Sequence, residues 1–115
     1  MKYLCLIYDD ETKMAKMTKQ ETDRLLADYG SFTTDIQASG RLVSAERLQA
    51  VSTASTVRVR DGKISTTDGP YAETKEQLGG YYLVEAKDLN DAIQTASRIP
   101  SARNGAIEVR PVWSM

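Results

Sequence analysis

Residues 68–82 read DGPYAETKEQLGGYY, a run that combines turn residues, acidic groups, adjacent glycines and paired tyrosines. Proline fixes its own φ and disfavours helix at the preceding residue, so the chain must turn at Gly69-Pro70. Asp68, at the head of this turn, is expected to accept hydrogen bonds from backbone N–H groups two residues on, which would fix its carboxylate in space. Helix-favouring residues 72–78 predict one or two helical turns that end at Gly79-Gly80.

This run has two interpretations. Turn residues occur wherever chains reverse, so the run can be purely structural. Polar groups held on a loop beside glycines and tyrosines are also typical of functional sites. On the functional interpretation a carboxylate is the general base and a cation anchors the ligand. The candidate residues are Asp68 and Glu73 as catalytic groups, and Gly69, Lys75, Tyr82 and Arg110 as ligand-binding groups.

The segments on either side of the run read as strands. Residues 56–60 and 63–67 alternate across Asp61-Gly62, and a two-residue Asp-Gly between such segments is a strong hairpin signal. The predicted hairpin leads directly into Asp68. After the run, residues 81–86 predict another strand. Before the hairpin, residues 41–51 predict a strand or irregular extended segment, whose apolar residues follow no regular period.

The amino-terminal segment 2–8 is apolar at nearly every position, which predicts a central strand covered on both faces. Cys5 is expected to be a small buried residue, because nothing near it in sequence would stabilise a thiolate. The carboxylates Asp9-Asp10-Glu11 follow. Such runs are usually solvated loop, although adjacent carboxylates can bind a hard cation. We expect no metal site here.

Two helices are predicted. Thr18 and Glu21 have the spacing of a capping box, and the helix that they begin ends near Gly40. Asp88 caps the second helix, which Pro100 ends. The apolar stripe of the first helix consists of Leu25, Tyr29, Phe32 and Ile36. Residues 106–113 then alternate, with Ile107, Val109, Pro111 and Trp113 on one side and Glu108 and Arg110 on the other.

This order of elements predicts a single α+β domain over residues 1–115, of the ferredoxin-like β-α-β-β-α-β type with an extra hairpin. Both helices would cover the same sheet face. The other face would then expose the apolar first strand, which predicts a homodimer with its sheets face to face around a cavity, a dimeric α/β barrel-like assembly. Glu108 and Arg110 would project into that cavity and pair there, or Arg110 would bind an anionic ligand.

Composition excludes several classes of function. The chain has one cysteine and no histidine, which rules out an internal disulfide, a Ser-His-Asp triad and the usual zinc sites. Fifteen basic and sixteen acidic residues give a net charge of −1, so nucleic acid and anionic membranes are not expected as partners. We expect a cytoplasmic protein without a cofactor, because the sequence contains neither a membrane-spanning run nor a signal segment.

Three motifs carry a resemblance to a known family. Residues 68–76 (DGPYAETKE), 79–82 (GGYY) and 108–112 (EVRPV) together resemble the DGPF branch of the YCII-related family, with Tyr71 where the branch name has Phe. The likeness covers nearly the whole chain and implies a ferredoxin-like α+β dimer of bacterial type. The YCII branch of that family keeps a histidine and an aspartate. This chain has no histidine, and Ile99-Pro100 stands where the aspartate would be expected, so that dyad is absent.

Two functions are therefore predicted. In the first, the protein binds or transforms a small polar or anionic metabolite in the dimer cavity by carboxylate acid–base chemistry, such as an isomerisation or elimination. In the second, it is a non-catalytic dimeric module for ligand sensing or regulation, because relatives of the DGPF type resemble companions of bacterial sigma-factor systems. Asp68→Asn separates these hypotheses, since only an enzyme has turnover to lose.

Overall fold

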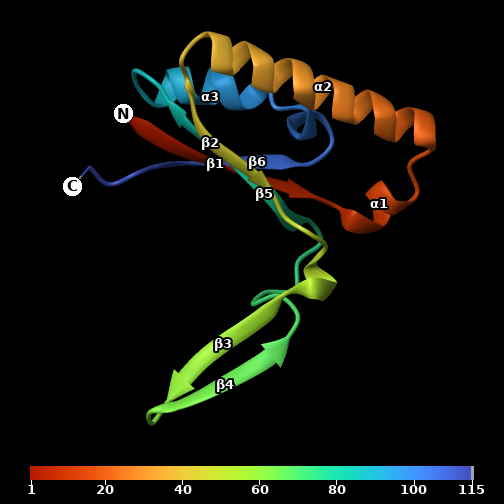
Figure 1. The fold of residues 1–115 in the computed structure, drawn as a ribbon, viewed down its shortest axis with the longest axis vertical. Helices are drawn as coiled ribbons and strands as arrows, with labels where there is room; N and C mark the ends of the chain where they lie inside the picture. The colour runs from red at the N-terminus through yellow and green to blue at the C-terminus, as the bar shows by residue number, and fades with distance from the viewer. Residues whose placement is uncertain (115) are drawn as a thin grey trace.

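The computed structural model describes residues 1–114 and shows an α+β arrangement (Figure 1). The main sheet has four antiparallel strands in the order β2-β5-β1-β6, and two further strands form a separate hairpin. The main strands are β1 (Lys2–Asp9), β2 (Leu42–Arg47), β5 (Gln77–Glu85) and β6 (Ala106–Pro111). The helices are α1 (Glu11–Ala15), α2 (Lys19–Ala38) and α3 (Leu89–Ser97), with short 3₁₀ turns η1 (Val51–Thr53) and η2 (Pro100–Arg103). This arrangement is compatible with the predicted ferredoxin-like plan.

The core lies between the sheet and helices α2 and α3, which cover the same side of it (Figure 1). The predicted central position of β1 is confirmed, because it pairs with β5 on one side and β6 on the other. Its side chains alternate: Tyr3, Cys5 and Ile7 are buried against the helices, whereas Leu4 and Leu6 are only partly buried on the opposite face. Within one chain, therefore, β1 is covered on one face and not on both as predicted.

Local signals explain where α2 begins and ends. The Thr18 hydroxyl accepts a hydrogen bond from the Glu21 N–H (3.1 Å), and the Glu21 carboxylate accepts one from the Thr18 N–H (3.0 Å). This pair is the predicted capping box. Gly40, with φ of 74°, follows the end of the helix, as predicted. The carboxy-terminal half of α2 buries Phe32 and Ile36 against the sheet.

An ion pair joins the residue before β2 to the start of α3. Arg41 Nη1 donates to Asp91 Oδ2 (2.9 Å), and the Lys87 N–H donates to the same oxygen (2.9 Å). The hydrogen bond from Arg41 is the main reason that the pKa of Asp91 lies below its ordinary value, and the bond from the Lys87 backbone adds to it. The fold therefore prefers this carboxylate in its ionised form.

The Arg41–Asp91 pair contributes stability that is lost in acid. The pKa of Asp91 is lower in the folded state than in the unfolded state, where it is 3.8. The stability that this carboxylate contributes is therefore complete above the unfolded pKa and is lost as pH falls through the folded pKa. Asp91→Asn should therefore have a lower melting temperature than the wild type at pH 7. Below about pH 4 its melting temperature should fall less steeply with pH than that of the wild type. Thermal unfolding between pH 7 and pH 2.5 measures this, with Asp23→Asn in the exposed Lys19–Asp23 pair as the control. Parallel curves for wild type and Asp91→Asn would contradict it.

The hairpin forms as predicted. Its strands are β3 (Ser55–Arg60) and β4 (Lys63–Asp68), and Asp61 and Gly62 between them have φ values of 51° and 74°. It extends away from the main sheet (Figure 1). Val57, Val59 and Ile64 are 60%, 58% and 76% exposed, so the hairpin presents apolar side chains to solvent.

The prediction for residues 72–78 was wrong. This segment forms no helix, and strand β5 already begins at Gln77, so that Gly79-Gly80 lies inside a strand and does not end a helix. Gln77 pairs with Asp9 and Leu78 with Tyr8 of the central strand. Pairing with β1 and β2 thus overrides the local helix preference of the segment.

The predicted turn at Asp68 needs a correction as well. Its carboxylate accepts no hydrogen bond within residues 1–114, because the residue two positions on is Pro70, which has no N–H. The turn depends on Gly69, whose φ of 108° suits glycine and whose N–H donates to the Ala54 carbonyl (2.8 Å). The extended segment predicted over 41–51 is strand only as far as Arg47, and Trp113 lies beyond β6.

Candidate functional site

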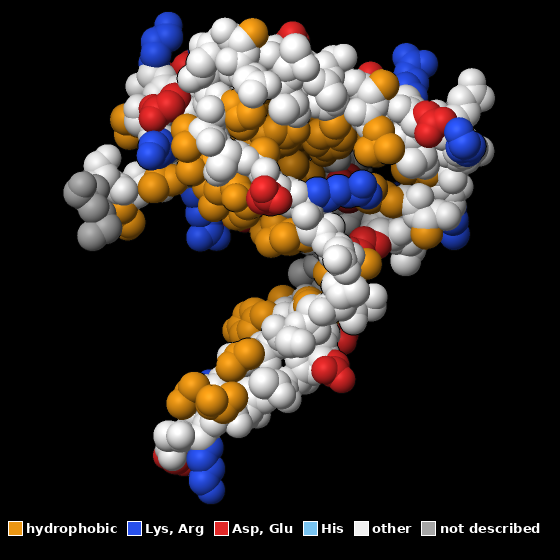
Figure 2. All heavy atoms as spheres, viewed as in Figure 1, with side chains coloured by type: hydrophobic (Ala, Val, Ile, Leu, Met, Phe, Trp, Pro, Cys, Tyr) orange, Lys and Arg blue, Asp and Glu red, His pale blue; other side chains and the backbone are white. Residues whose placement is uncertain are grey.

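A pocket of 630 Å³ lies beneath the amino-terminal half of α2, over the ends of β1, β2 and β5. Its volume is in the range of pockets that hold small molecules. Figure 2 shows hydrophobic side chains gathered beneath α2 on this side of the molecule. Most lining residues are apolar or glycine: Ile7, Met14, Ala15, Leu25, Leu26, Ala45, Leu48, Ala50, Gly79 and Gly80. The others are Asp9, Glu11, Tyr29, Glu46, Arg47, Tyr81, Tyr82 and Ser101.

A chain of three hydrogen-bonded side chains forms the polar part of this pocket. Ser101 Oγ donates to Asp9 Oδ2 (2.8 Å), and the Tyr29 hydroxyl lies 2.5 Å from Ser101 Oγ. A serine hydroxyl has one proton to donate, so when Ser101 donates to Asp9 it must accept from Tyr29. The three residues therefore form a relay from Tyr29 through Ser101 to the carboxylate of Asp9.

The surroundings of this relay change its acidity. Burial raises the pKa of the Asp9 carboxyl above its ordinary value; the hydrogen bond from Ser101 lowers it, and the nearby carboxylate of Glu76 raises it further. Burial likewise raises the pKa of the Tyr29 hydroxyl, which keeps it a neutral donor. A carboxylate with a raised pKa in a partly apolar pocket is suited to general acid–base chemistry.

Two close backbone approaches build this end of the pocket. A Cβ at Gly105 would lie 2.0 Å from the Tyr8 carbonyl oxygen and 2.8 Å from Asp9 Oδ1, so only glycine lets the segment between η2 and β6 pack against the end of β1. The Gly105 N–H donates to the Ser101 carbonyl (2.7 Å). At the other approach, a Cβ at Gly80 would lie 2.7 Å from the Glu46 carbonyl oxygen. Gly105 thus permits the spacing that brings Ser101 to Asp9, and Gly80 permits the close approach of β5 to β2.

The residues predicted from sequence as a site are not brought together by the structure. Tyr82 lines the pocket; it is 6% exposed, and its hydroxyl lies 2.7 Å from Thr33 Oγ1. Asp68, at the end of β4, and Gly69, Glu73 and Lys75 on the loop between β4 and β5 do not line it. Arg110, on the edge strand β6, is hydrogen-bonded to Glu108, so the predicted pairing of these two residues is confirmed. The functional roles predicted for these residues stay predictions.

Sequence reasoning missed Asp9, Tyr29 and Ser101 as a group. The sequence predicts a solvated loop over Asp9-Asp10-Glu11, but its three carboxylates have different partners. Asp10 caps α1 by accepting from the Thr12 N–H (3.0 Å), and Glu11 accepts from the Val51 N–H (3.2 Å). Within residues 1–114 no group of three or more such side chains could hold a metal ion. One available signal was that Asp9 continues the alternation of Tyr3, Cys5 and Ile7 along the buried strand, which places its side chain on the side of the core.

Burial also decides the role of Cys5. It is fully buried in the core, and desolvation raises the pKa of its thiol to about 11. Its thiolate is therefore not available at neutral pH, which agrees with the expectation of an inert residue.

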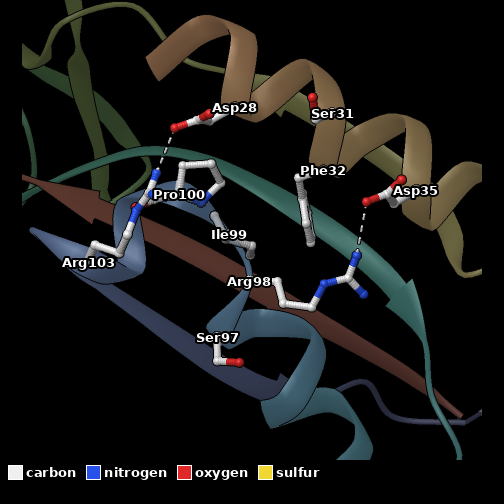
Figure 3. Close-up of a pocket in the computed structure, with 9 residues that line it drawn as sticks. All are labelled: Asp28, Ser31, Phe32, Asp35, Ser97, Arg98, Ile99, Pro100 and Arg103. Atoms are coloured by element: carbon white, nitrogen blue, oxygen red, sulfur yellow. Dashed lines mark hydrogen bonds and ion pairs between the residues drawn. The ribbon is translucent and has the colours of Figure 1, made fainter. Parts of the chain in front are cut away.

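A second, smaller pocket of 320 Å³ lies between α2 and the segment that joins α3 to η2 (Figure 3). Arg103 pairs with Asp28 (3.0 Å) and Arg98 pairs with Asp35 (3.4 Å) across it, on either side of Phe32. The four charged lining groups thus neutralise one another in pairs and hold α2 against the carboxy-terminal part of the chain. We therefore take the pocket beneath α2 as the candidate site.

The architecture and the pocket together define a class: a small α+β protein with an antiparallel sheet, helices on one face and an internal carboxylate site between them. In the part of the chain that the structure describes, no helix is both long enough and apolar enough to span a membrane.

Comparison with known proteins identifies the family. The model of the YCII-related domain matches residues 1–115, and the chain belongs to this family. It is also similar to an uncharacterised protein of Rhizobium meliloti (strain 1021), with 35% identity over 114 residues, which cover 97% of this chain and 92% of the relative. The relative has no described activity, so the function must be argued from the site.

Proposed function

We propose that the protein binds a small molecule beneath α2 and transfers a proton to or from it through Asp9. The observation that carries this proposal is the hydrogen-bonded relay of Tyr29, Ser101 and Asp9 at the wall of a largely apolar pocket. Isomerisation and elimination need a base and a group that stabilises developing negative charge. The relay supplies the base, since Asp9 accepts the proton, and a bound ligand can replace Ser101 as the acceptor of the Tyr29 hydroxyl proton.

The raised pKa of Asp9 supports this proposal for a chain without histidine. An ordinary aspartate is a weak base at neutral pH, and a raised pKa brings it closer to the optimum for proton transfer. The apolar walls of the pocket partly desolvate the carboxylate, which strengthens its interactions with a bound ligand. This retains the carboxylate chemistry predicted from the sequence and assigns it to Asp9.

The loop of residues 69–76 between β4 and β5 is proposed to border the same site. Glu76 is close enough to raise the pKa of Asp9, and the Gln77 side chain accepts from the Glu11 N–H (2.9 Å). Asp68, at the end of β4, and Glu73, on this loop, remain candidates for acid–base roles. Membership of the DGPF branch of the family also remains a proposal. A loop beside a pocket is well placed to change its access when a ligand binds.

Hydrogen–deuterium exchange on a bound ligand tests the proposal. Small organic acids and carbonyl compounds would first be screened for a rise in the melting temperature of the wild type. Each compound that binds is then incubated with the protein in D₂O, and deuterium in its C–H positions is measured by mass spectrometry. Exchange with the wild type and with Asp68→Asn, but not with Asp9→Asn, supports Asp9 as the base. Equal exchange by wild type and Asp9→Asn, or no exchange on any binder, would overturn the proposal.

A non-catalytic ligand-binding or regulatory module is the second candidate. The observation that favours it is the hairpin of β3 and β4, which extends from the sheet and exposes Val57, Val59 and Ile64. Exposed apolar groups on a projecting element suit contact with another protein. In this case ligands would bind beneath α2 without isotope exchange, and binding would change the affinity of a partner.

We also propose that the protein is a homodimer, with a second copy on the sheet face opposite the helices. Leu4, Leu6 and Leu83 lie on that face and are only partly buried in the single chain. Apolar side chains at the centre of a sheet face are unfavourable in contact with water and are commonly covered by a partner. A face-to-face dimer would give the barrel-like assembly predicted from the sequence.

Leu6→Glu tests this dimer. A charge at the centre of a buried apolar interface is strongly unfavourable, so the variant should have about half the molar mass of the wild type at micromolar concentration. Light scattering coupled to size-exclusion chromatography measures the mass. Leu89→Glu, at a 48% exposed position on α3, is the control and should remain dimeric. A monomeric wild type would refute the proposal.

A further inference from the structure

We propose that the ligand of this pocket carries a negatively charged group on an apolar body, and that Arg47 binds the charged group. This inference rests on the proposed function only in placing the ligand beneath α2. It assigns a recognition residue that is separate from the proton-transferring Asp9.

Arg47 is the only basic residue among those that line the pocket. It is the last residue of β2 and lies two positions after Ala45, which packs against the core, so both side chains are on the helix side of the sheet. Within residues 1–114 its guanidinium makes no ion pair. The charge of Arg47 is therefore available to a ligand.

The acidic residues that line the pocket do not pair with Arg47, so its guanidinium can bind a ligand. Glu46 alternates with Ala45 and Arg47 along β2, so its side chain is directed to the opposite face. The Glu11 carboxylate accepts from the Val51 N–H (3.2 Å), and Asp9 accepts from Ser101. Guanidinium groups bind carboxylates and phosphates through paired, charge-assisted hydrogen bonds, which explains the preference for an anion.

The rest of the lining defines the other part of the ligand. Met14 of α1, Leu25 and Leu26 of α2, and Leu48 after β2 present apolar side chains to the same cavity of 630 Å³. These side chains stabilise a hydrocarbon or aromatic body through the hydrophobic effect. A ligand anchored at Arg47 by its anionic group would thus place its body in the pocket that contains Asp9.

Matched pairs of carboxylates and amides test the inference by isothermal titration calorimetry. The probes are 3-methylbutanoate with 3-methylbutanamide, phenylacetate with phenylacetamide, and 3-phenylpropanoate with 3-phenylpropanamide. We expect the wild type to bind at least one carboxylate about 10-fold more tightly than its amide, as for a charge-assisted hydrogen bond. Arg47→Gln should remove this preference and leave the affinity for the amide unchanged. Arg60→Gln, at the hairpin tip, removes the same charge away from the pocket and should keep the preference.

The possible results separate the two proposals. If carboxylate and amide bind equally, or if Arg47→Gln keeps the preference, the role of Arg47 is refuted, although isotope exchange through Asp9 can still hold. If Arg47→Gln loses the preference while Asp9→Asn still exchanges ligand hydrogens, the recognition role stands and the proposed catalytic role fails. If none of the six compounds binds, the assigned ligand class is wrong.

Discussion

Asp9→Asn is expected to abolish isotope exchange on a bound ligand and, at neutral pH, to make the domain more stable. Removing a general base typically slows proton transfer by about 10²- to 10⁴-fold. The gain in stability follows from the raised pKa of Asp9, which shows that burial disfavours its ionised form in the folded state. Asparagine has no charge to bury, and its side-chain oxygen can still accept the hydrogen bond from Ser101.

The sign of the pH dependence follows from proton binding. The folded state of the wild type binds a proton at Asp9 more strongly than the unfolded state, in which this carboxyl has its ordinary pKa of 3.8. The contribution of Asp9 to the free energy of unfolding therefore decreases as pH rises from 3.8 through the folded pKa. At pH 7 this contribution is still reduced. Asp9→Asn should remove this decrease. Greater stability together with lost activity would distinguish a functional carboxylate from a structural one.

Asp10→Asn is the matched control, because the neighbouring carboxylate has the opposite electrostatic environment. The hydrogen bond from the Thr12 hydroxyl is the main reason that the pKa of Asp10 is lowered, so the fold prefers this group ionised. Asp10→Asn should therefore lose stability at pH 7 and keep isotope exchange. Urea unfolding at pH 3 and pH 7 measures both variants. If Asp9→Asn were less stable than the wild type at pH 7, the argument from burial would be wrong.

Gly105→Ala is expected to destabilise the domain by about 3 kcal/mol, the upper end for overpacked sites. The added Cβ would lie 2.0 Å from the Tyr8 carbonyl oxygen, which is backbone and not the flexible end of a side chain. Tyr8 belongs to β1, which is held by pairing with strands on both sides, so the strand cannot move away easily. The η2 turn would have to shift, which would also separate Ser101 from Asp9.

Gly30→Ala is the control for this substitution. Gly30 lies inside α2, and a Cβ there would meet no atom within 4 Å. Alanine is a better helix former than glycine, so the variant should gain up to about 1 kcal/mol. Urea unfolding gives both values. A loss at Gly105→Ala of less than about 1 kcal/mol, which is typical of an ordinary substitution, would mean that the turn can adjust and that its position is not set by this contact.

The elements that local chemistry controls could be predicted from the sequence. The capping box of Thr18 and Glu21 and the hairpin turn at Asp61-Gly62 involve residues close together in the chain, so their geometry follows from neighbouring groups. The alternation in β6 likewise placed Ile107 and Val109 toward the core, and Glu108 is paired with Arg110 as expected. Together these elements predicted the α+β plan and the separate hairpin.

The segment 72–78 shows where local preference was insufficient. Its residues favour helix, yet Gln77 and Leu78 belong to a strand between β1 and β2. Their partners, Asp9 and Tyr8, are distant in sequence, so the backbone hydrogen bonds that decide this conformation form only when the sheet assembles. The dense polar motif at 68–76 therefore attracted functional interpretation, whereas the pocket formed elsewhere.

The candidate site depends on contacts between distant parts of the chain. Asp9, Tyr29 and Ser101 come from the end of a strand, the middle of a helix and a turn, and none belongs to a recognisable motif. Asp9 acquires its raised pKa only when packing removes water from it and brings Ser101 within hydrogen-bond distance. Sequence patterns record preferences of neighbouring residues, which decided the helices, the hairpin and the general plan. Desolvation and long-range hydrogen bonding arise only in the packed molecule, and these make Asp9 a candidate base.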